Sequence, residues 1–241
     1  MRMEAIVLCG GSAKRMKPYL SFSKALAKIK DGVSLIEYQI DWLINAGINR
    51  IILAIDRKTY RTLRHLGLCL NDQVVYSIEE EKLGTGGAVY NAVNQLESQI
   101  FYLMNVDDIL LSETYTPSNL LGILQENKEA SGSILLTRAR FPFGIVETSS
   151  DWVKGFKQKP WLNYKICSGH YAFTKEGIRR YFPQKGDFEN TALQQMAQHN
   201  CLISQELDGE WITVNNIKQL EAAKQKLMIV PSIETVAMRL A

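Results

Sequence analysis

The first two-thirds of the chain alternates short apolar runs with segments in which apolar residues recur every three or four positions. Continuous apolar runs of this length are typical of strands buried on both faces of a mostly parallel sheet. Between the first two runs, Ser34 and Glu37 stand at capping-box spacing and Gly47 supplies a stop, which predicts a helix over 34–47. Further helices are expected over 86–96 and 116–128. The predicted strands cover 4–9, 50–55, 73–78, 100–105 and 132–139.

This repeated strand–helix–strand order predicts an α/β fold, Rossmann-like, with a mixed but mostly parallel central sheet. After about residue 140 the pattern changes, and a small antiparallel β addition is expected. Its strands are predicted at 143–148, 152–158 and 168–174, with later strands at 201–207 and 210–215. Helices are expected near 175–182, 188–198 and 216–228.

We expect one domain over residues 1–228 and a tail over 229–241, in which Pro231 breaks the pattern. The tail has two interpretations, a short docking helix that packs on the domain or a contact in a homo-oligomer. The sequence does not decide between them.

Composition narrows the class of protein. With 46% hydrophobic and 22% charged residues among 241, the chain can bury a sizeable core. No apolar run approaches the ~20 residues of a membrane span, and no signal-peptide cleavage site follows the start. Four scattered cysteines indicate neither a disulfide framework nor a zinc module. The net charge of +3 suits anionic small molecules, and without a basic stripe it does not indicate nucleic acid. We therefore expect a cytoplasmic protein with no membrane or nucleic-acid partner.

The strongest chemical signal follows the first strand. Gly10 and Gly11 let the backbone approach a ligand closely, so that its amides can surround phosphate oxygens. Four cations, Lys14, Arg15, Lys17 and Lys24, lie within a short span beside them and match a polyanion such as a triphosphate. Neither known glycine-rich phosphate-loop pattern is present. The alternative is a glycine turn among solvated basic residues.

Two further segments follow predicted strands. Residues 83–88 form a glycine-rich turn that leads into a helix, and close approach of a planar ligand competes there with a flexible turn. Asp107 and Asp108 end another strand, where carboxylates are natural ligands for Mg²⁺. The alternative for this pair is an Asx turn or a helix cap. Because three such segments end successive strands of one sheet, a shared ligand site is favoured.

Together these segments resemble the sugar-1-phosphate nucleotidylyltransferases, the enzymes that make nucleoside-diphosphate sugars. The opening signature LAGGxGTRLxPLT with PKxL is matched in part by residues 8–11, Arg15, Pro18 and 23–26, and the LGTGGA segment by 83–88. Residues 105–107 resemble NGD, 143–146 YGVV, 156–160 FxEKP and 210–214 the W-x-D-x-G segment. The resemblance is collinear from residue 1 to about 228, which is more specific than any single motif.

The resemblance implies roles for individual residues and a magnesium cofactor. Catalysis would use Arg15 on the triphosphate, Lys24 at the α-phosphate and Asp107 as the Mg²⁺ ligand. The remaining assignments divide between the two substrates. Nucleotide binding falls to Leu8, Gly10, Gly11, Ser12, Ala13, Lys14, Glu81, Gly84 and Thr85, and sugar-phosphate binding to Gly144, Gln158, Lys159, Ser168 and Gly169.

The departures from the family pattern bear on activity. Ala13 and Lys14 replace Gly-Thr, and Val106 replaces the glycine before the metal aspartate. Gln158 stands where the family has a sugar-contacting Glu. Thr213 occupies the position of the second metal-binding aspartate, and a neutral hydroxyl is a poor substitute for a carboxylate on Mg²⁺.

The implied reaction moves a nucleoside monophosphate from a nucleoside triphosphate to a sugar-1-phosphate and releases pyrophosphate. Glu81 could accept hydrogen bonds from the N1 and N2 donors of guanine, and guanylyltransferases of this fold carry a similar acidic residue, so GTP is the preferred donor. Two alternatives stay open. One is a regulatory relative that binds a nucleotide or NDP-sugar with little turnover, and the other is an enzyme that acts on a non-sugar phosphate.

Overall fold

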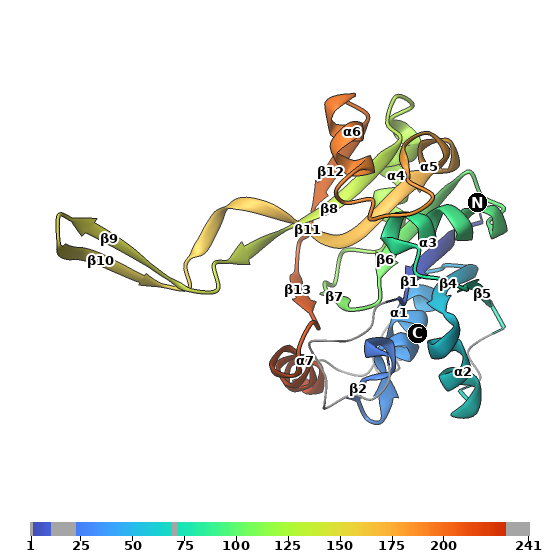
Figure 1. Ribbon diagram of the computed structural model, residues 1–241, viewed down its shortest axis with the longest axis horizontal. Helices are drawn as coiled ribbons and strands as arrows, with labels where there is room; N and C mark the ends of the chain where they lie inside the picture. The colour runs from blue at the N-terminus through green and yellow to red at the C-terminus, as the bar shows by residue number, and fades with distance from the viewer. Residues whose placement is uncertain (1, 11–22, 69–71, 230–241) are drawn as a thin grey trace.

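A seven-stranded mixed sheet forms the centre of the protein in the computed structural model, which describes residues 2–10, 23–68 and 72–229 (Figure 1). The strand order is β12-β8-β11-β6-β1-β4-β5. Strands β6, β1, β4 and β5 run parallel, whereas β11 is antiparallel to β6 and β8. The α/β fold with a mostly parallel sheet is confirmed. The strands are β1 (Glu4–Leu8), β4 (Arg50–Asp56), β5 (Val74–Glu79), β6 (Ile100–Asn105), β8 (Gly132–Arg140), β11 (Trp161–Thr174) and β12 (Leu202–Glu206).

The strand order reverses between β1 and β6. From β1 the chain adds β4 and β5 on one side of the sheet and then returns to place β6 on the other side. The carboxyl ends of β1 and β6 lie side by side, with Leu8 paired to Asn105. Such a reversal leaves a crevice outside the strand ends, where ligands bind in open α/β sheets.

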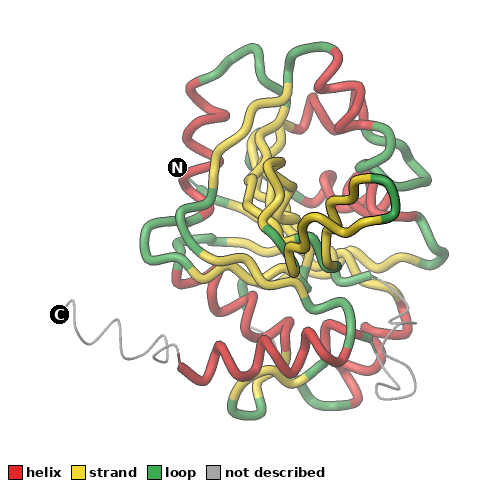
Figure 2. The backbone as a smooth tube through the Cα atoms, turned by 90° about the vertical axis from the view of Figure 1, so that its left-hand side faces the viewer, coloured by secondary structure: helices red, strands yellow, loops and turns green. Residues whose placement is uncertain are grey.

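Helices cover both faces of the sheet (Figure 2). Alternate residues of the strands belong to two hydrophobic cores, one on each face of the sheet. Ala5 and Val7 lie in the core covered by α1, α2, α4 and α7, whereas Ile6 and Leu8 lie in the core covered by α3, α5 and α6. The predicted capping box of Ser34 and Glu37 starts α1. The α-helices are α1 (Leu35–Asn45), α2 (Arg57–His65), α3 (Gly84–Ala92), α4 (Pro117–Glu126), α5 (Lys175–Tyr181), α6 (Ala192–Gln198) and α7 (Ile217–Ile229); the short 3₁₀ turns are η2 (Lys24–Leu26) and η3 (Val93–Gln95).

The antiparallel addition consists of separate two-stranded pairs. The predicted strand at 168–174 is instead the end of the long β11, because its residues pair with β6 in the central sheet. The pairs are β2 (Lys28–Lys30) with β3 (Val33–Ser34), β7 (Asp108–Leu111) with β13 (Glu210–Thr213), and β9 (Gly144–Ser149) with β10 (Trp152–Gln158). The last pair is a hairpin that projects from the body (Figure 1).

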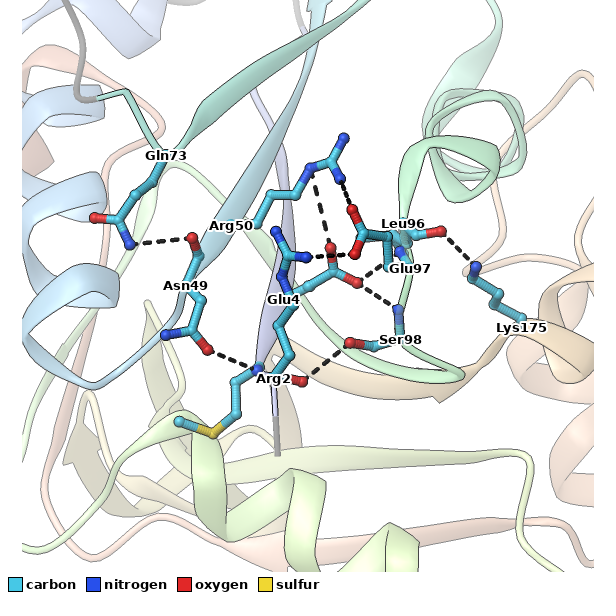
Figure 3. A network of polar contacts seen from close by, with 10 residues as sticks. Arg2, Glu4, Asn49, Arg50, Gln73, Leu96, Glu97, Ser98 and Lys175 are labelled. Carbon is cyan, nitrogen blue, oxygen red and sulfur yellow. Dashed lines mark hydrogen bonds and ion pairs between the residues drawn. The ribbon is translucent and has the colours of Figure 1, made fainter.

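A buried carboxylate fixes the amino end of β1 against the segment that leads into β6 (Figure 3). The Glu4 carboxylate accepts hydrogen bonds from the backbone N–H groups of Glu97, at 2.7 Å, and Ser98, at 2.5 Å. Arg50 lies between the two acids, with Nη1 2.7 Å from a Glu97 oxygen and Nε 4.0 Å from Glu4. The network ties the two central strands at this end and so helps to fix their register at the other.

The predicted tail falls almost wholly outside the described residues, since α7 ends at Ile229 and residues 230–241 follow it. Its role as a docking helix or an oligomer contact stays a prediction. None of the helices in the described part of the chain is long and apolar enough to cross a membrane. The described cysteines Cys9, Cys167 and Cys201 form no disulfide.

Candidate active site

A lysine and an aspartate from distant segments meet beyond the carboxyl ends of β1 and β6. Ser23 caps η2, and Ala25, Leu26 and Ala27 are buried, so the turn is anchored and Lys24 is directed to the strand ends. Lys24 Nζ forms an ion pair with Asp107, which follows β6. Both side chains are largely shielded from solvent, where a charge pair is screened less than at the surface. Two of the three predicted catalytic residues are therefore brought together, and the third, Arg15, lies outside the described residues.

Asn215 completes this cluster from a third segment. Its side-chain oxygen accepts a hydrogen bond from Lys24 Nζ at 3.3 Å, and its amide nitrogen donates to Thr213 Oγ1 at 2.8 Å. The pairing of β13 with β7 holds the segment in place, and Val214 N donates to the Asp107 carbonyl at 2.9 Å. Oxygens of Asp107 and Asn215 thus converge on one cation. The sequence did not single out Asn215, because its role depends on the β13–β7 pairing.

Asp108 is turned inward beside this cluster. Its carboxylate accepts hydrogen bonds from Trp211 Nε1 at 3.1 Å and Asn105 Nδ2 at 3.0 Å. Burial, reinforced by the charge of Asp107, raises the pKa of Asp108 to about 7. Gly169 makes room for it: a Cβ there would lie 2.0 Å from an Asp108 oxygen, and its φ of +79° also favours glycine. The Asp108 carboxylate therefore stabilises the buried side of the site, whereas Asp107 faces Lys24.

His170 is fully buried and supports the site from below. Its Nε2–H donates to the Asp108 carbonyl at 2.9 Å, because a carbonyl can only accept. Nδ1 is then the acceptor for the Tyr102 hydroxyl at 2.7 Å, and Tyr102 in turn accepts from Tyr115 at 3.2 Å. Burial lowers the pKa of His170 to about 3, so the ring is neutral.

The glycine-rich segment 83–88 packs against the loop after α5. A Cβ on Gly84 would lie 2.6 Å from the Gly186 carbonyl oxygen, and Gly86 N donates to that oxygen at 2.9 Å. The Thr85 hydroxyl donates to Glu189 at 2.5 Å. The density of glycines in this segment therefore has a packing cause in addition to the predicted role in nucleotide binding.

The acidic residue nearest to Gly10 is Glu79. Glu79 ends β5 and is half-buried, and its Oε1 lies 3.8 Å from the point where a Gly10 Cβ would stand. Burial raises the pKa of Glu79 above its usual range. Glu81, which the sequence favoured, is exposed and pairs with Lys185 at 2.9 Å. The sequence predicted Glu81 for this position, and the end of β5 places Glu79 beside Gly10 instead.

The other predicted residues are spread over three places. Leu8 is buried at the end of β1, and Gly10 beyond it is exposed. The Ser168 hydroxyl is buried and donates to the Leu135 carbonyl at 3.0 Å, which leaves only its backbone for a sugar phosphate. Gly144, Gln158 and Lys159 lie on the projecting hairpin or directly after it. Gly11, Ser12, Ala13, Lys14 and Arg15 lie outside the described residues.

The carboxylate and amide oxygens around Lys24 Nζ suit a hard metal cation that also binds phosphate. Carboxylate and amide oxygens are the ligands that Mg²⁺ takes in proteins, and that ion keeps several waters. The described residues contain no group of three or more His, Cys, Asp or Glu side chains that could hold a metal. Asp107 with the Asn215 oxygen therefore fits an ion shared with a nucleotide better than one enclosed by protein.

Comparison with known proteins identifies the family. A family model described as nucleotidyl transferase matches residues 4–228, and the chain belongs to that family. Among its relatives are the mannose-1-phosphate guanylyltransferase catalytic subunits beta of Xenopus tropicalis, 28% identical over 232 residues, and Drosophila melanogaster, 27% over 225. These matches cover 90% and 89% of this chain but 62% and 60% of the relatives. The resemblance to the sugar-1-phosphate nucleotidylyltransferases is thereby confirmed.

Solved structures support the same fold. The crystal structure of HddC from Yersinia pseudotuberculosis superposes with a TM-score of 0.71 at 22% identity, over 93% of this chain and 99% of that one. A UDP-glucose pyrophosphorylase complexed with UDP-glucose gives 0.70 at 14% identity, over 95% and 99%. At these identities the likeness concerns the fold alone.

The neutral His170 predicts a pH dependence of stability. Unfolded, its imidazole takes up a proton below about pH 6.5, whereas the folded ring stays neutral down to about 3. Acidification therefore favours unfolding, and the free-energy advantage of the wild type over His170→Gln should shrink by about 1 kcal/mol for each pH unit between 6 and 4. Asp108, whose pKa is raised, acts in the opposite direction in both proteins. Urea unfolding of both across this range measures the difference.

His199→Gln serves as the matched control, because His199 is exposed beside Tyr181. A difference between the wild type and His170→Gln that stays constant with pH would contradict the assignment of a buried neutral ring.

Proposed function

We propose that the protein transfers a nucleoside monophosphate from a nucleoside triphosphate to a sugar-1-phosphate, giving an NDP-sugar and pyrophosphate, with GTP as the preferred donor. The observation that carries the proposal is the meeting of Lys24, Asp107 and Asn215 at the point where the strand order reverses. Membership of the nucleotidyl transferase family supports it, as does the similarity to mannose-1-phosphate guanylyltransferases. A structure of HddC complexed with GMP-PN, at 21% identity, is consistent with nucleotide binding by this fold.

In the proposed reaction a phosphate oxygen of the sugar-1-phosphate forms a bond to the α-phosphorus. The bond from that phosphorus to the β-phosphate oxygen breaks in line, and its electron pair leaves with pyrophosphate. Because the attacking oxygen is already anionic, no side chain needs to remove a proton. The protein has to position two polyanions that repel each other and neutralise charge at the transferring phosphorus.

Charged side chains divide this work. Lys24 stands at the α-phosphate, where its ion pair with Asp107 opens to admit the nucleotide. Arg15, by resemblance, clamps the triphosphate, and Lys159 binds the sugar phosphate. Each positioned cation contributes the equivalent of about 10²–10³ in rate.

Nucleotidyltransferases of this family generally use a divalent metal, and we propose Mg²⁺ here. Asp107 would hold it with the amide oxygen of Asn215, and the bound ion would neutralise charge on the phosphate oxygens of the nucleotide. Thr213 donates no charge, and its hydroxyl already accepts a hydrogen bond from Asn215. The protein therefore supplies one carboxylate, and the nucleotide supplies the other anionic ligands.

The base slot is proposed to lie between Gly10 and the segment beginning at Gly84, with Glu79 in place of Glu81 as the acceptor for guanine. A carboxylate can accept from both N1–H and N2–H of guanine, whereas uracil offers one N–H between two carbonyls. The half-buried position of Glu79 beside Gly10 supports this choice.

A pyrophosphate-release assay with Mg²⁺, four triphosphates and several sugar-1-phosphates tests the transfer. The wild type should release pyrophosphate with a sugar-1-phosphate, and Lys24→Ala should lower kcat by about 10²–10³. Lys28→Ala is the control, since Lys28 lies four residues away on the surface. The thermal midpoint should stay nearly unchanged in Lys28→Ala and fall far less than the activity in Lys24→Ala, where Asp107 loses its partner.

Three results would alter the proposal. Nucleotide binding without turnover would favour the regulatory relative that Thr213 permits, and turnover with only non-sugar phosphates would favour the other alternative. Equal losses of activity and melting temperature in Lys24→Ala would make that lysine structural.

Glu79→Gln tests the base assignment. The amide can no longer accept both guanine hydrogens, so kcat/KM for GTP should fall about 10- to 100-fold, equivalent to ~1–3 kcal/mol, with little change for UTP. Glu81→Gln removes only an exposed ion pair with Lys185, so it should change the GTP value by less than about twofold. The reverse ranking of the two variants would return the role to Glu81.

A further inference from the structure

One polar side chain lies on the buried face of α1. Gln39 is 1% exposed, and the other buried residues of this helix are apolar: Leu35, Ile36, Ile40 and Leu43. Burial of an amide in such surroundings costs free energy unless its hydrogen-bonding groups find partners. A buried glutamine at this position therefore indicates a specific polar contact.

The contact is with the backbone on both sides of Asp107. Gln39 Nε2 donates to the Val106 carbonyl at 3.1 Å and to the Asp108 carbonyl at 2.8 Å. Residues 106 and 107 form the turn between β6 and β7, so one side-chain amide spans the turn that carries Asp107. An amide NH₂ group has two donors, and no other neutral side chain of this length offers two from a single atom.

Other elements bond to the remaining carbonyls of this turn. The Asp107 carbonyl accepts from the Val214 N–H at 2.9 Å. The Asp108 carbonyl accepts a second hydrogen bond from His170 Nε2 at 2.9 Å, which its two lone pairs allow. Without Gln39, the Asp108 carbonyl would keep His170, whereas the Val106 carbonyl would lose this donor. Gln39 is thus the side chain that ties the turn to α1.

The first turn of the same helix is bonded to the segment that carries Lys24. The Leu35 N–H donates to the Ala27 carbonyl at 2.9 Å, and Ala27 directly follows η2. Gln39 lies four positions later in α1, a rise of about 6 Å. One turn of α1 therefore connects the two segments whose side chains form the Lys24–Asp107 ion pair.

We propose that Gln39 is a positioning residue for nucleotidyl transfer, which holds the 106–108 turn against α1 and so sets the Asp107 carboxylate relative to Lys24. This inference rests on the proposed function. The side chain of Gln39 is buried and bonded to backbone, so it acts through Asp107 and not on a substrate. A displacement of about 1 Å at a reacting group can lower the rate about 10²-fold, which gives such a contact a large effect.

Gln39→Met tests this role, because methionine has a similar length and no N–H donor. The turn should loosen, and kcat for transfer should fall about 10- to 100-fold. The KM for the sugar-1-phosphate should change by less than about threefold, since the contacts of that substrate are not altered. The kinetics are measured at a temperature at which the variant remains folded.

Gln73→Met is the matched control, because Gln73 makes the same kind of contact elsewhere. Its Nε2 donates to the carbonyls of Ile48, at 3.2 Å, and Asn49, at 3.0 Å (Figure 3). These residues precede β4, at the end of the sheet opposite to Asp107. The control should lower the thermal midpoint, while its kcat stays within about twofold of the wild type. A kcat that falls no further in Gln39→Met than in Gln73→Met would overturn the proposal.

Amide hydrogen exchange tests the positioning in the nucleotide-free protein. The Val214 N–H reports on the turn, because it donates to the Asp107 carbonyl. In Gln39→Met its exchange should accelerate at least about tenfold more than that of the buried strand amide of Ile6, whereas in Gln73→Met it should not. Unchanged relative exchange at Val214 in Gln39→Met would mean that the turn is held without Gln39, and would refute the proposal.

Two further outcomes separate the role of Gln39 from the proposed function. A turn that loosens by exchange while kcat is unchanged would limit Gln39 to a structural role and contradict positioning. A wild type that makes no NDP-sugar would refute the function and with it the role in transfer, whereas the exchange at Val214 would still decide whether Gln39 holds the turn.

Discussion

The ion pair between Lys24 and Asp107 joins segments 83 residues apart at the reversal of strand order, and the rest of the site is arranged around it. Its two charges face each other because η2 is anchored by buried alanine and leucine side chains and because β6 ends beside β1. A partly shielded pair of this kind costs desolvation that its mutual attraction must offset. A nucleotide that carries a metal ion can offer its phosphate to Lys24 and the ion to Asp107. Each residue then exchanges its partner for another opposite charge, and the ion pair can open.

Asp107 and Asp108 are adjacent in the chain, but their carboxylates differ in burial and in partners. Asp107 forms an ion pair with Lys24, whereas Asp108 is held inward by Trp211 and Asn105, and desolvation raises its pKa. The neutral His170 below it holds the Asp108 carbonyl, and Gly169 leaves the space that the Asp108 carboxylate fills. These contacts fix the backbone from which Asp107 projects.

Much of this could be predicted where local pattern and burial agree. The strands of the parallel half are continuous apolar runs because both of their faces are covered, and the capping box of Ser34 and Glu37 is local. A shared site at the ends of β1 and β6 was predicted from the rule that carboxyl ends of parallel strands share an edge, and Lys24 and Asp107 both lie there. The helix α2, rich in arginine, and β7, directly after Asp107 in the chain, lack such a pattern. The projection of the β9–β10 hairpin depends on the irregular pairing of β8 with β11, and the contacts of Asn215 depend on the pairing of β13 with β7, so neither has a local signal in the sequence.

The proposed function requires one carboxylate, Asp107, to exchange Lys24 for a metal delivered with the nucleotide. Calorimetric titration of Mg²⁺ into the protein, with and without a non-hydrolysable GTP analogue, tests this most directly. We expect weak binding to the nucleotide-free protein, where Lys24 neutralises Asp107, and much tighter binding with the analogue, a gain that Asp107→Asn abolishes. Tight binding of Mg²⁺ to the nucleotide-free protein that Asp107→Asn leaves unaffected would contradict it.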